Sequence, residues 1–323
     1  MQRLCTFGIS AFALLCLGIA ISHHPARGQT ARTIKVLISV PAGGTIDFFV
    51  RVLADHIGKT NGQTVIVESR PGAAGMIAAE ALARAAPDGN TLLVNHNGIV
   101  INSILRKVSF DLSGFEPVCF AVHSPQVLVV NSASPYRTLD DLIAAARAQP
   151  GAVSIASVGP ATTQHFAIER LKRLAGIDMT YVPFGGGAPA INALLGGHVT
   201  AVLQNYSESG EQISAGNLRA LATPSARRIA PLPAVPTIAE SGFPNFEAEA
   251  WFGLVAPGKT PKETVTQLID WFGAALRAPD VKAKLEVQGL YPDPKCGADF
   301  AAHIQRQTEE YARLIRESNI KAE

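Results

Sequence analysis

The chain has 323 residues, of which 47% are hydrophobic and 17% charged, with 28 Lys and Arg against 26 Asp and Glu. This balance, without a basic stripe, argues against a nucleic-acid-binding protein. The length suffices for two domains of ordinary size, and beyond the N-terminal segment no stretch approaches a membrane span, so we expect a soluble mature protein.

The N-terminal segment has the pattern of an export signal. Arg3 precedes an apolar run over 4–21, and the small-x-small triplet Ala26-Arg27-Gly28 offers a cleavage site. We therefore predict a signal peptide at residues 1–28, with Gln29 as the new N-terminus. An uncleaved membrane anchor is the alternative, which the glycines and serines within the run disfavour.

Strand and helix patterns alternate from Ile34 onward. Short apolar runs predict strands, and the repeat of Ile46, Phe49, Val50, Leu53 and Ile57 predicts a helix with one buried face. A βαβα order indicates a parallel sheet covered by helices on both faces. The first strands are expected at 35–40, 64–68 and 91–95.

The β-prone stretch 116–131 is interrupted by Ser124-Pro125. A strand broken in this way is typical of a crossing between two lobes, with a β-hairpin as the alternative. The Pro-rich segment 231–236, followed by a β-prone run at 251–256, predicts the return crossing.

A second alternating set lies between the two crossings. Thr138 and Asp141 form a predicted capping box at the start of a helix, and Thr260-Pro261 with Glu263 predicts another helix start. We expect two doubly wound α/β lobes, 29–122 with 236–323 and 123–235, with the option that the C-terminal helix packs across to the second. The strands of the second lobe are expected at 153–157, 179–183, 199–203 and 218–222.

Two cysteines, Cys119 and Cys296, remain after the predicted processing. Export to an oxidising compartment permits a disulfide between them, and buried free thiols are the alternative. No group of Cys or His has metal-ligand spacing, and neither a GxGxxG nor a P-loop is present, so no metal or cofactor is expected.

Three loops that each join a strand to a helix are candidates for a binding site, because ligands of open α/β sheets lie beyond the carboxyl ends of the strands. They are 43–47, 157–165 and 183–189. Their glycines permit close approach of the backbone, and the free amides of a first helical turn favour an anion. Asp47 is the one acid among their glycines and is expected to have a structural role at its helix start as well.

The ordered set of motifs over the mature chain resembles the Bug proteins, which are the substrate-binding receptors of tripartite tricarboxylate transporters. The motifs are Gly43-Gly44-Thr45-Ile46-Asp47, Ser69-Arg70-Pro71-Gly72-Ala73-Ala74-Gly75, Ala86-Pro87-Asp88-Gly89-Asn90-Thr91-Leu92-Leu93, Leu194-Leu195-Gly196-Gly197-His198-Val199, Leu218-Arg219-Ala220-Leu221-Ala222 and Trp251-Phe252-Gly253-Leu254-Val255-Ala256-Pro257.

The resemblance implies a periplasmic binding protein fold of the Venus-flytrap, type II-like kind. It implies periplasmic capture of a small carboxylate (an organic acid, an acidic amino acid or an aromatic acid), delivery to a membrane permease, and no catalysis. The ligand carboxylate would be held by backbone amides and small hydroxyls rather than by an arginine, and we expect a monomer. Carried over by position, the ligand-binding residues would be Gly43, Gly44, Thr45, Asp47, Ser157, Thr162, Thr163, His165, Gly185, Gly186, Ala188, Gln204 and Asn205.

The chain departs from the family pattern in three places. The first loop is about two residues shorter, Phe184-Gly185 stands where a Lys-Gly pair is common, and Gln204 stands where Asp is frequent. These departures favour a less charged or partly aromatic ligand.

Two other functions are compatible with these features. A receptor that passes the captured ligand's signal to a sensor kinase would have the same binding lobes. A secreted hydrolase is disfavoured, because no Gly-x-Ser-x-Gly elbow marks a nucleophile and His96 and His123 have no recognisable partner in the sequence.

Overall fold

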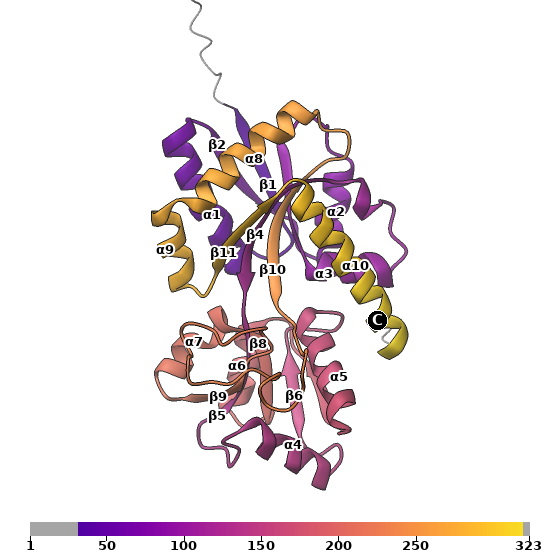
Figure 1. Cartoon of the computed structure of the whole chain (residues 1–323), viewed down its shortest axis with the longest axis vertical. Coiled ribbons are helices and arrows are strands. Elements are labelled where there is room, and N and C mark those ends of the chain that lie inside the picture. Colours follow the sequence, from indigo (N-terminus) through magenta and orange to yellow (C-terminus); the bar gives the residue numbers. More distant parts are fainter. Residues whose placement is uncertain (1–31, 319–323) are drawn as a thin grey trace, which may run out of the picture. The chain divides into compact units, whose positions relative to one another are not determined.

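A computed structural model describes residues 32–318, so the signal peptide predicted at 1–28 lies outside the described residues. From Thr33 onward the chain forms one compact unit that contains two β-sheets with helices packed on them (Figure 1). The predicted α/β class is confirmed. No helix within residues 32–318 is long and apolar enough to span a membrane.

The first sheet combines parallel and antiparallel strands. Parallel β1, β2 and β3 come from the first part of the chain, and β10 joins β3 to β4 by antiparallel pairing. In spatial order the strands are β11 (Tyr291–Cys296), β4 (Glu116–Ser124), β10 (Ala250–Ala256), β3 (Thr91–His96), β1 (Thr33–Ile38) and β2 (Thr64–Ser69).

The inner strands of this sheet are buried on both faces, so they are apolar on both sides rather than alternating, whereas the edge strands β2 and β11 are only partly buried. On β1, Val36 packs into a core with α1 and α8, and its neighbour Leu37 packs into a second core with α2 and α3. The helices are α1 (Thr45–Asn61), α2 (Met76–Ala83), α3 (Asn97–Leu105), α8 (Lys262–Arg277), α9 (Pro279–Val287) and α10 (Ala298–Ser318), with short 3₁₀ turns at Ala73–Gly75 and Leu112–Gly114.

The second sheet is built from the middle of the chain. Its strands β6, β7 and β8 are parallel, and β5 pairs antiparallel with β8 and β9. In spatial order they are β7 (Thr180–Pro183), β6 (Ser154–Ser157), β8 (Ala201–Asn205), β5 (Gln126–Asn131) and β9 (Leu218–Ala222). The helices are α4 (Leu139–Ala148), α5 (Thr163–Ala175), α6 (Gly187–Leu195) and α7 (Tyr206–Ser214).

The interruption at Ser124-Pro125 is a crossing between the sheets and not a hairpin. β4 belongs to the first sheet, and β5, which begins immediately after Pro125, belongs to the second. β10 provides the return into the first sheet, as predicted.

Two local features differ from the sequence-based expectations. Strand β11 carries two prolines and was not predicted; it is tolerated because β11 lies at the edge of the sheet. Thr260 does not cap α8: its hydroxyl donates to the carbonyl of Pro257, and Pro261 occupies the cap position. The capping box of Thr138 and Asp141 is present as predicted.

Cys119 and Cys296 form a disulfide. They lie opposite each other on the antiparallel strands β4 and β11. The bond joins positions 177 residues apart in the sequence and fixes the edge strand to a strand that continues into the crossing.

Candidate functional site

A cavity of about 500 Å³ lies where elements of both sheets meet, a volume in the usual range for a small-molecule site. Its wall includes the first residues of α1, α3, α5 and α6, each of which follows a strand in the chain. The first amides of a helix have no partner within the helix, and the helix dipole places partial positive charge there. Four such helix starts make the cavity attractive to an anion.

The cavity wall contains no lysine or arginine. Among its lining residues only His96 and Glu208 have titratable side chains. Burial lowers the pKa of His96 to about 4, so its ring is neutral at pH 7. An anion in this cavity would therefore be held by amides and hydroxyls.

His96 sets the orientation of a hydroxyl on the cavity wall. It caps α3, and its Nδ1 accepts the backbone N–H of Gly98 at 3.1 Å. Because an N–H can only donate, the proton of the neutral ring lies on Nε2, which is 2.7 Å from the Oγ of Ser39. Nε2 therefore donates to Ser39, and the Ser39 hydroxyl hydrogen is left to donate to a ligand.

Of the residues carried over from the family, eight line this cavity. They are Gly44, Thr45, Thr162, Thr163, Gly185, Gly186, Ala188 and Asn205, the last of which ends β8. Thr45 also approaches the Ser207 hydroxyl across 3.3 Å, and Gln164 donates to Asn205 at 3.3 Å. The hydroxyl of Thr162 is engaged locally, donating to Gly159 and accepting from His165.

The other five residues of that set do not line the cavity. Gly43 borders an adjoining cavity, and its amide donates to Asp47. Asp47 is buried and also accepts from Arg51 at 2.9 Å, which holds its carboxyl pKa below the usual value. Asp47 thus has the structural role expected at a helix start, and any ligand role for it stays a prediction.

Ser157, His165 and Gln204 are not among the residues that line the cavity. The buried Ser157 hydroxyl is 2.9 Å from the Tyr181 hydroxyl, and His165 stacks on the Tyr181 ring at 4.1 Å. Gln204 is completely buried, and neither of its amide atoms has a hydrogen-bond partner among the described residues. Ligand contacts by these three side chains also stay predictions.

Sequence reasoning missed several lining residues, among them the polar residues Ser39, His96, Asn102 and Glu208. His96 ends β3 and Ser39 directly follows β1, so the rule that ligands lie beyond the carboxyl ends of strands could have found both. Asn102 donates to the carbonyl of Ala161 and so joins α3 to the loop before α5. No pattern in the sequence indicated that contact.

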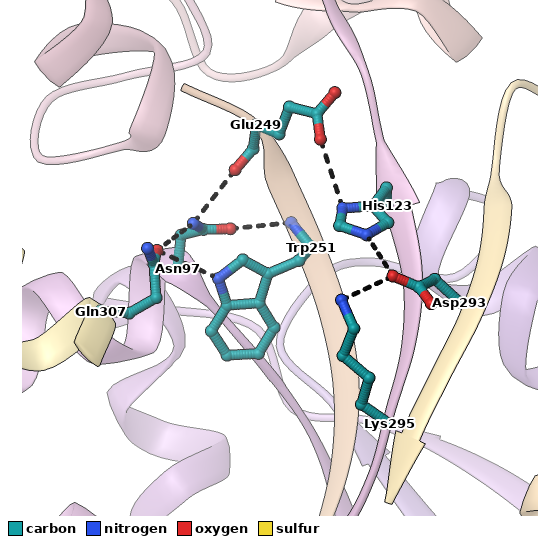
Figure 2. Close-up of polar contacts among 7 residues, drawn as sticks. All are labelled: Asn97, His123, Glu249, Trp251, Asp293, Lys295 and Gln307. Atoms are coloured by element: carbon teal, nitrogen blue, oxygen red, sulfur yellow. Dashed lines mark hydrogen bonds and ion pairs between the residues drawn. The ribbon is translucent and has the colours of Figure 1, made fainter. Parts of the chain in front are cut away.

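A cluster of charged side chains lies on β4, just before β10, and on the edge strand β11 beside β4 (Figure 2). His123 on β4 contacts Glu249, just before β10, at 3.2 Å and Asp293 on β11 at 3.1 Å; Asp293 also pairs with Lys295 at 2.6 Å. Burial opposes the charge on His123, but the two carboxylates outweigh it and raise its pKa. We call these four residues the crossing-strand cluster.

Asn97, at the start of α3, ties the same region to α10. Its side-chain oxygen accepts from the backbone N–H of Trp251, and its amide donates to the carbonyl of Glu249 (Figure 2). The same amide donates to the Tyr311 hydroxyl of α10. A second cavity of about 310 Å³ lies here, lined by charged residues of both signs. It lacks the converging helix starts of the larger cavity, which we therefore take as the candidate site. No group of three His, Cys, Asp or Glu within residues 32–318 could hold a metal ion.

The chain is similar to proteins of one family over most of its length. Residues 49–320 match the model of the tripartite tricarboxylate transporter family receptor. Protein BugT of Bordetella pertussis is 35% identical over 298 residues, covering 90% of each chain.

Two solved structures have the same fold. The structure of R. palustris Rpa4515 with adipate has a TM-score of 0.82 and 31% identity, covering 90% of this chain and 98% of the other. The structure of the periplasmic binding protein BugD has a TM-score of 0.81 and 28% identity, covering 91% and 100%. The similarity in sequence and in fold shows that this chain belongs to the family of tripartite tricarboxylate transporter receptors.

Proposed function

We propose that this protein is a periplasmic solute-binding receptor that captures a small carboxylate in the cavity of about 500 Å³. The observation that carries the proposal is the convergence of four helix starts on a cavity without lysine or arginine. Such a wall solvates one carboxylate by amides and hydroxyls. The adipate in the related Rpa4515 structure supports a carboxylate as the ligand class.

The periplasm is the compartment in which this function would be performed. The related BugD is a periplasmic binding protein, and the disulfide between Cys119 and Cys296 suits an oxidising compartment. On this proposal, cleavage after Gly28 releases a monomeric mature protein. Ligand capture would favour a closed form that a tripartite membrane permease recognises.

Catalysis forms no part of this proposal. Ser39 and His96 are 2.7 Å apart, the distance expected between a serine nucleophile and its histidine base, but here the histidine is the hydrogen-bond donor and the serine the acceptor. Since Nδ1 of His96 accepts from Gly98, Nε2 carries the proton and cannot take one from Ser39. A histidine pKa of about 4 further weakens the ring as a base near pH 7.

A thermal-shift screen of the mature chain tests the carboxylate proposal. A ligand that binds only the native state raises the free energy of unfolding, by about 2.7 kcal/mol at a hundred times its Kd. We expect at least one small carboxylic acid to raise the Tm by several degrees. The methyl ester of the same acid is the matched control and should give no shift. The proposal would be rejected if the esters raised the Tm as much as the acids, or if no acid raised it.

A further inference from the structure

Glu208 is the one acidic side chain in the wall of the cavity. It lies in the first turn of α7 and also borders the adjoining cavity that contains Gly43. The residue as a whole is exposed, but the protein around its carboxyl group displaces water and raises its pKa to about 7. Within residues 32–318, no other side chain forms a hydrogen bond or an ion pair with this carboxylate.

The chain makes room for this carboxylate at Gly187. A Cβ at Gly187 would lie 2.4 Å from one carboxylate oxygen of Glu208 and 2.6 Å from its carboxyl carbon. Gly187 is the first residue of α6 and does not have a positive φ, so its backbone conformation does not require glycine. Glu208 thus packs directly against position 187, and a side chain there would displace its carboxyl group from its present position.

The carboxylate of Glu208 consequently occupies the side of the cavity at the start of α6. The starts of α1, α3 and α5 remain for the carboxylate of a ligand. The other titratable group in the two cavities that contain Glu208 is His96, which is neutral near pH 7. A second ligand carboxylate near α6 would therefore meet Glu208 without a cation to separate the two charges.

We propose that Glu208 determines the specificity of this site by accepting a hydrogen bond from a donor group of the ligand, so that the receptor selects carboxylates that carry an ammonium or hydroxyl group over dicarboxylates. This inference rests on the proposed function and names the ligand class within it. A donor opposite Glu208 completes its hydrogen bonding, whereas a methyl group leaves the carboxylate unpaired. The same contact rejects a second carboxylate by repulsion of like charges.

Matched series of acids test the proposal by calorimetry on the mature protein at pH 8. The first series is 4-aminobutyrate, 4-hydroxybutyrate, butyrate and succinate. The corresponding acids with five and six carbons are also measured, so that one series matches the distance between the helix starts and Glu208. We expect wild type to bind the amino or hydroxy acid of one length at least tenfold more tightly than the dicarboxylate. In Glu208→Gln that ratio should fall at least tenfold, mainly because the dicarboxylate binds more tightly.

Glu211→Gln is the control, since Glu211 is exposed on the same helix and does not line the cavity. It should leave the ratio unchanged. Lowering the pH from 8 to 6 should tighten dicarboxylate binding to wild type, as Glu208 becomes protonated, and not to Glu208→Gln. A dicarboxylate preference in wild type, or the same ratio in wild type and Glu208→Gln, would overturn the role of Glu208 and leave carboxylate capture standing. Failure of every acid to bind would instead reject the proposed function, and this inference with it.

Discussion

Ser39 accepts a hydrogen bond from Nε2 of His96 across 2.7 Å, so the serine hydroxyl hydrogen points away from the histidine. The two residues follow neighbouring parallel strands, β1 and β3, which end at the same edge of the sheet. The half-buried, neutral histidine thus leaves the Ser39 hydroxyl as a donor on the cavity wall.

Replacing Ser39 by alanine should weaken ligand binding without unfolding the protein. A hydrogen bond to a charged group contributes about 1.5–3 kcal/mol, so we expect the Kd to rise about tenfold to a hundredfold in Ser39→Ala. Calorimetry with the acid that gives the largest thermal shift measures this. Ser103→Ala removes a hydroxyl that bonds within α3, outside the cavity wall, and serves as the control. Equal affinities of both variants and wild type would exclude Ser39 from the site.

The crossing-strand cluster should make stability depend on pH. The pKa of His123 in the folded protein is raised above its ordinary value of 6.5. Its contribution to stability is therefore fully present below pH 6.5 and is lost as the pH rises through the folded pKa. We expect the free energy of unfolding of wild type to fall over this interval and that of His123→Gln to fall less.

Denaturant titrations at several pH values provide this measurement. The matched control is His198→Gln, because His198 is exposed and distant in sequence from the crossing strands. A pH dependence in His123→Gln as steep as that of wild type would contradict the ion pairs of His123 with Glu249 and Asp293.

Removing the disulfide should destabilise the protein. The bond between Cys119 and Cys296 closes a loop of 177 residues, and such cross-links contribute about 2–5 kcal/mol, mainly by restricting the unfolded chain. We expect the double variant Cys119→Ser, Cys296→Ser to have a clearly lower Tm than wild type under oxidising conditions. With reductant present, the Tm of wild type should approach that of the variant. If the variant and wild type have the same Tm, and reductant does not change the Tm of wild type, the thiols are free.

Gln204 should prove replaceable by a side chain of similar shape. Its amide is buried without a partner among the described residues, and a buried unpaired polar group costs about 1–3 kcal/mol. We expect Gln204→Met to raise the free energy of unfolding by about 1 kcal/mol and to change ligand affinity less than twofold. Denaturant unfolding and calorimetry test the two parts. A loss of affinity would return Gln204 to the ligand-binding residues predicted from the family pattern.

The order of the elements and the loops of the candidate site could be predicted from the sequence, because both depend on local patterns. Apolar periodicity locates strands and helices, and the glycines of 43–44 and 185–187 mark the places where strands lead into helices. The crossing at Ser124-Pro125 was predicted for the same reason, since proline interrupts a strand locally.

Only the tertiary structure decided which polar groups meet. Ser39 and His96 are 57 positions apart and the two cysteines 177, and no local pattern encodes such separations. Strand β11 depends on β4 for its pairing, so its own proline-rich sequence does not predict it. Glu208 and Gly187 meet because α6 and α7 pack together, a contact that no local pattern in the sequence indicates. Local sequence patterns thus determined the strand-to-helix loops that form a cavity suited to a carboxylate. Contacts between residues distant in sequence placed Glu208 in its wall and oriented the hydrogen-bond donors.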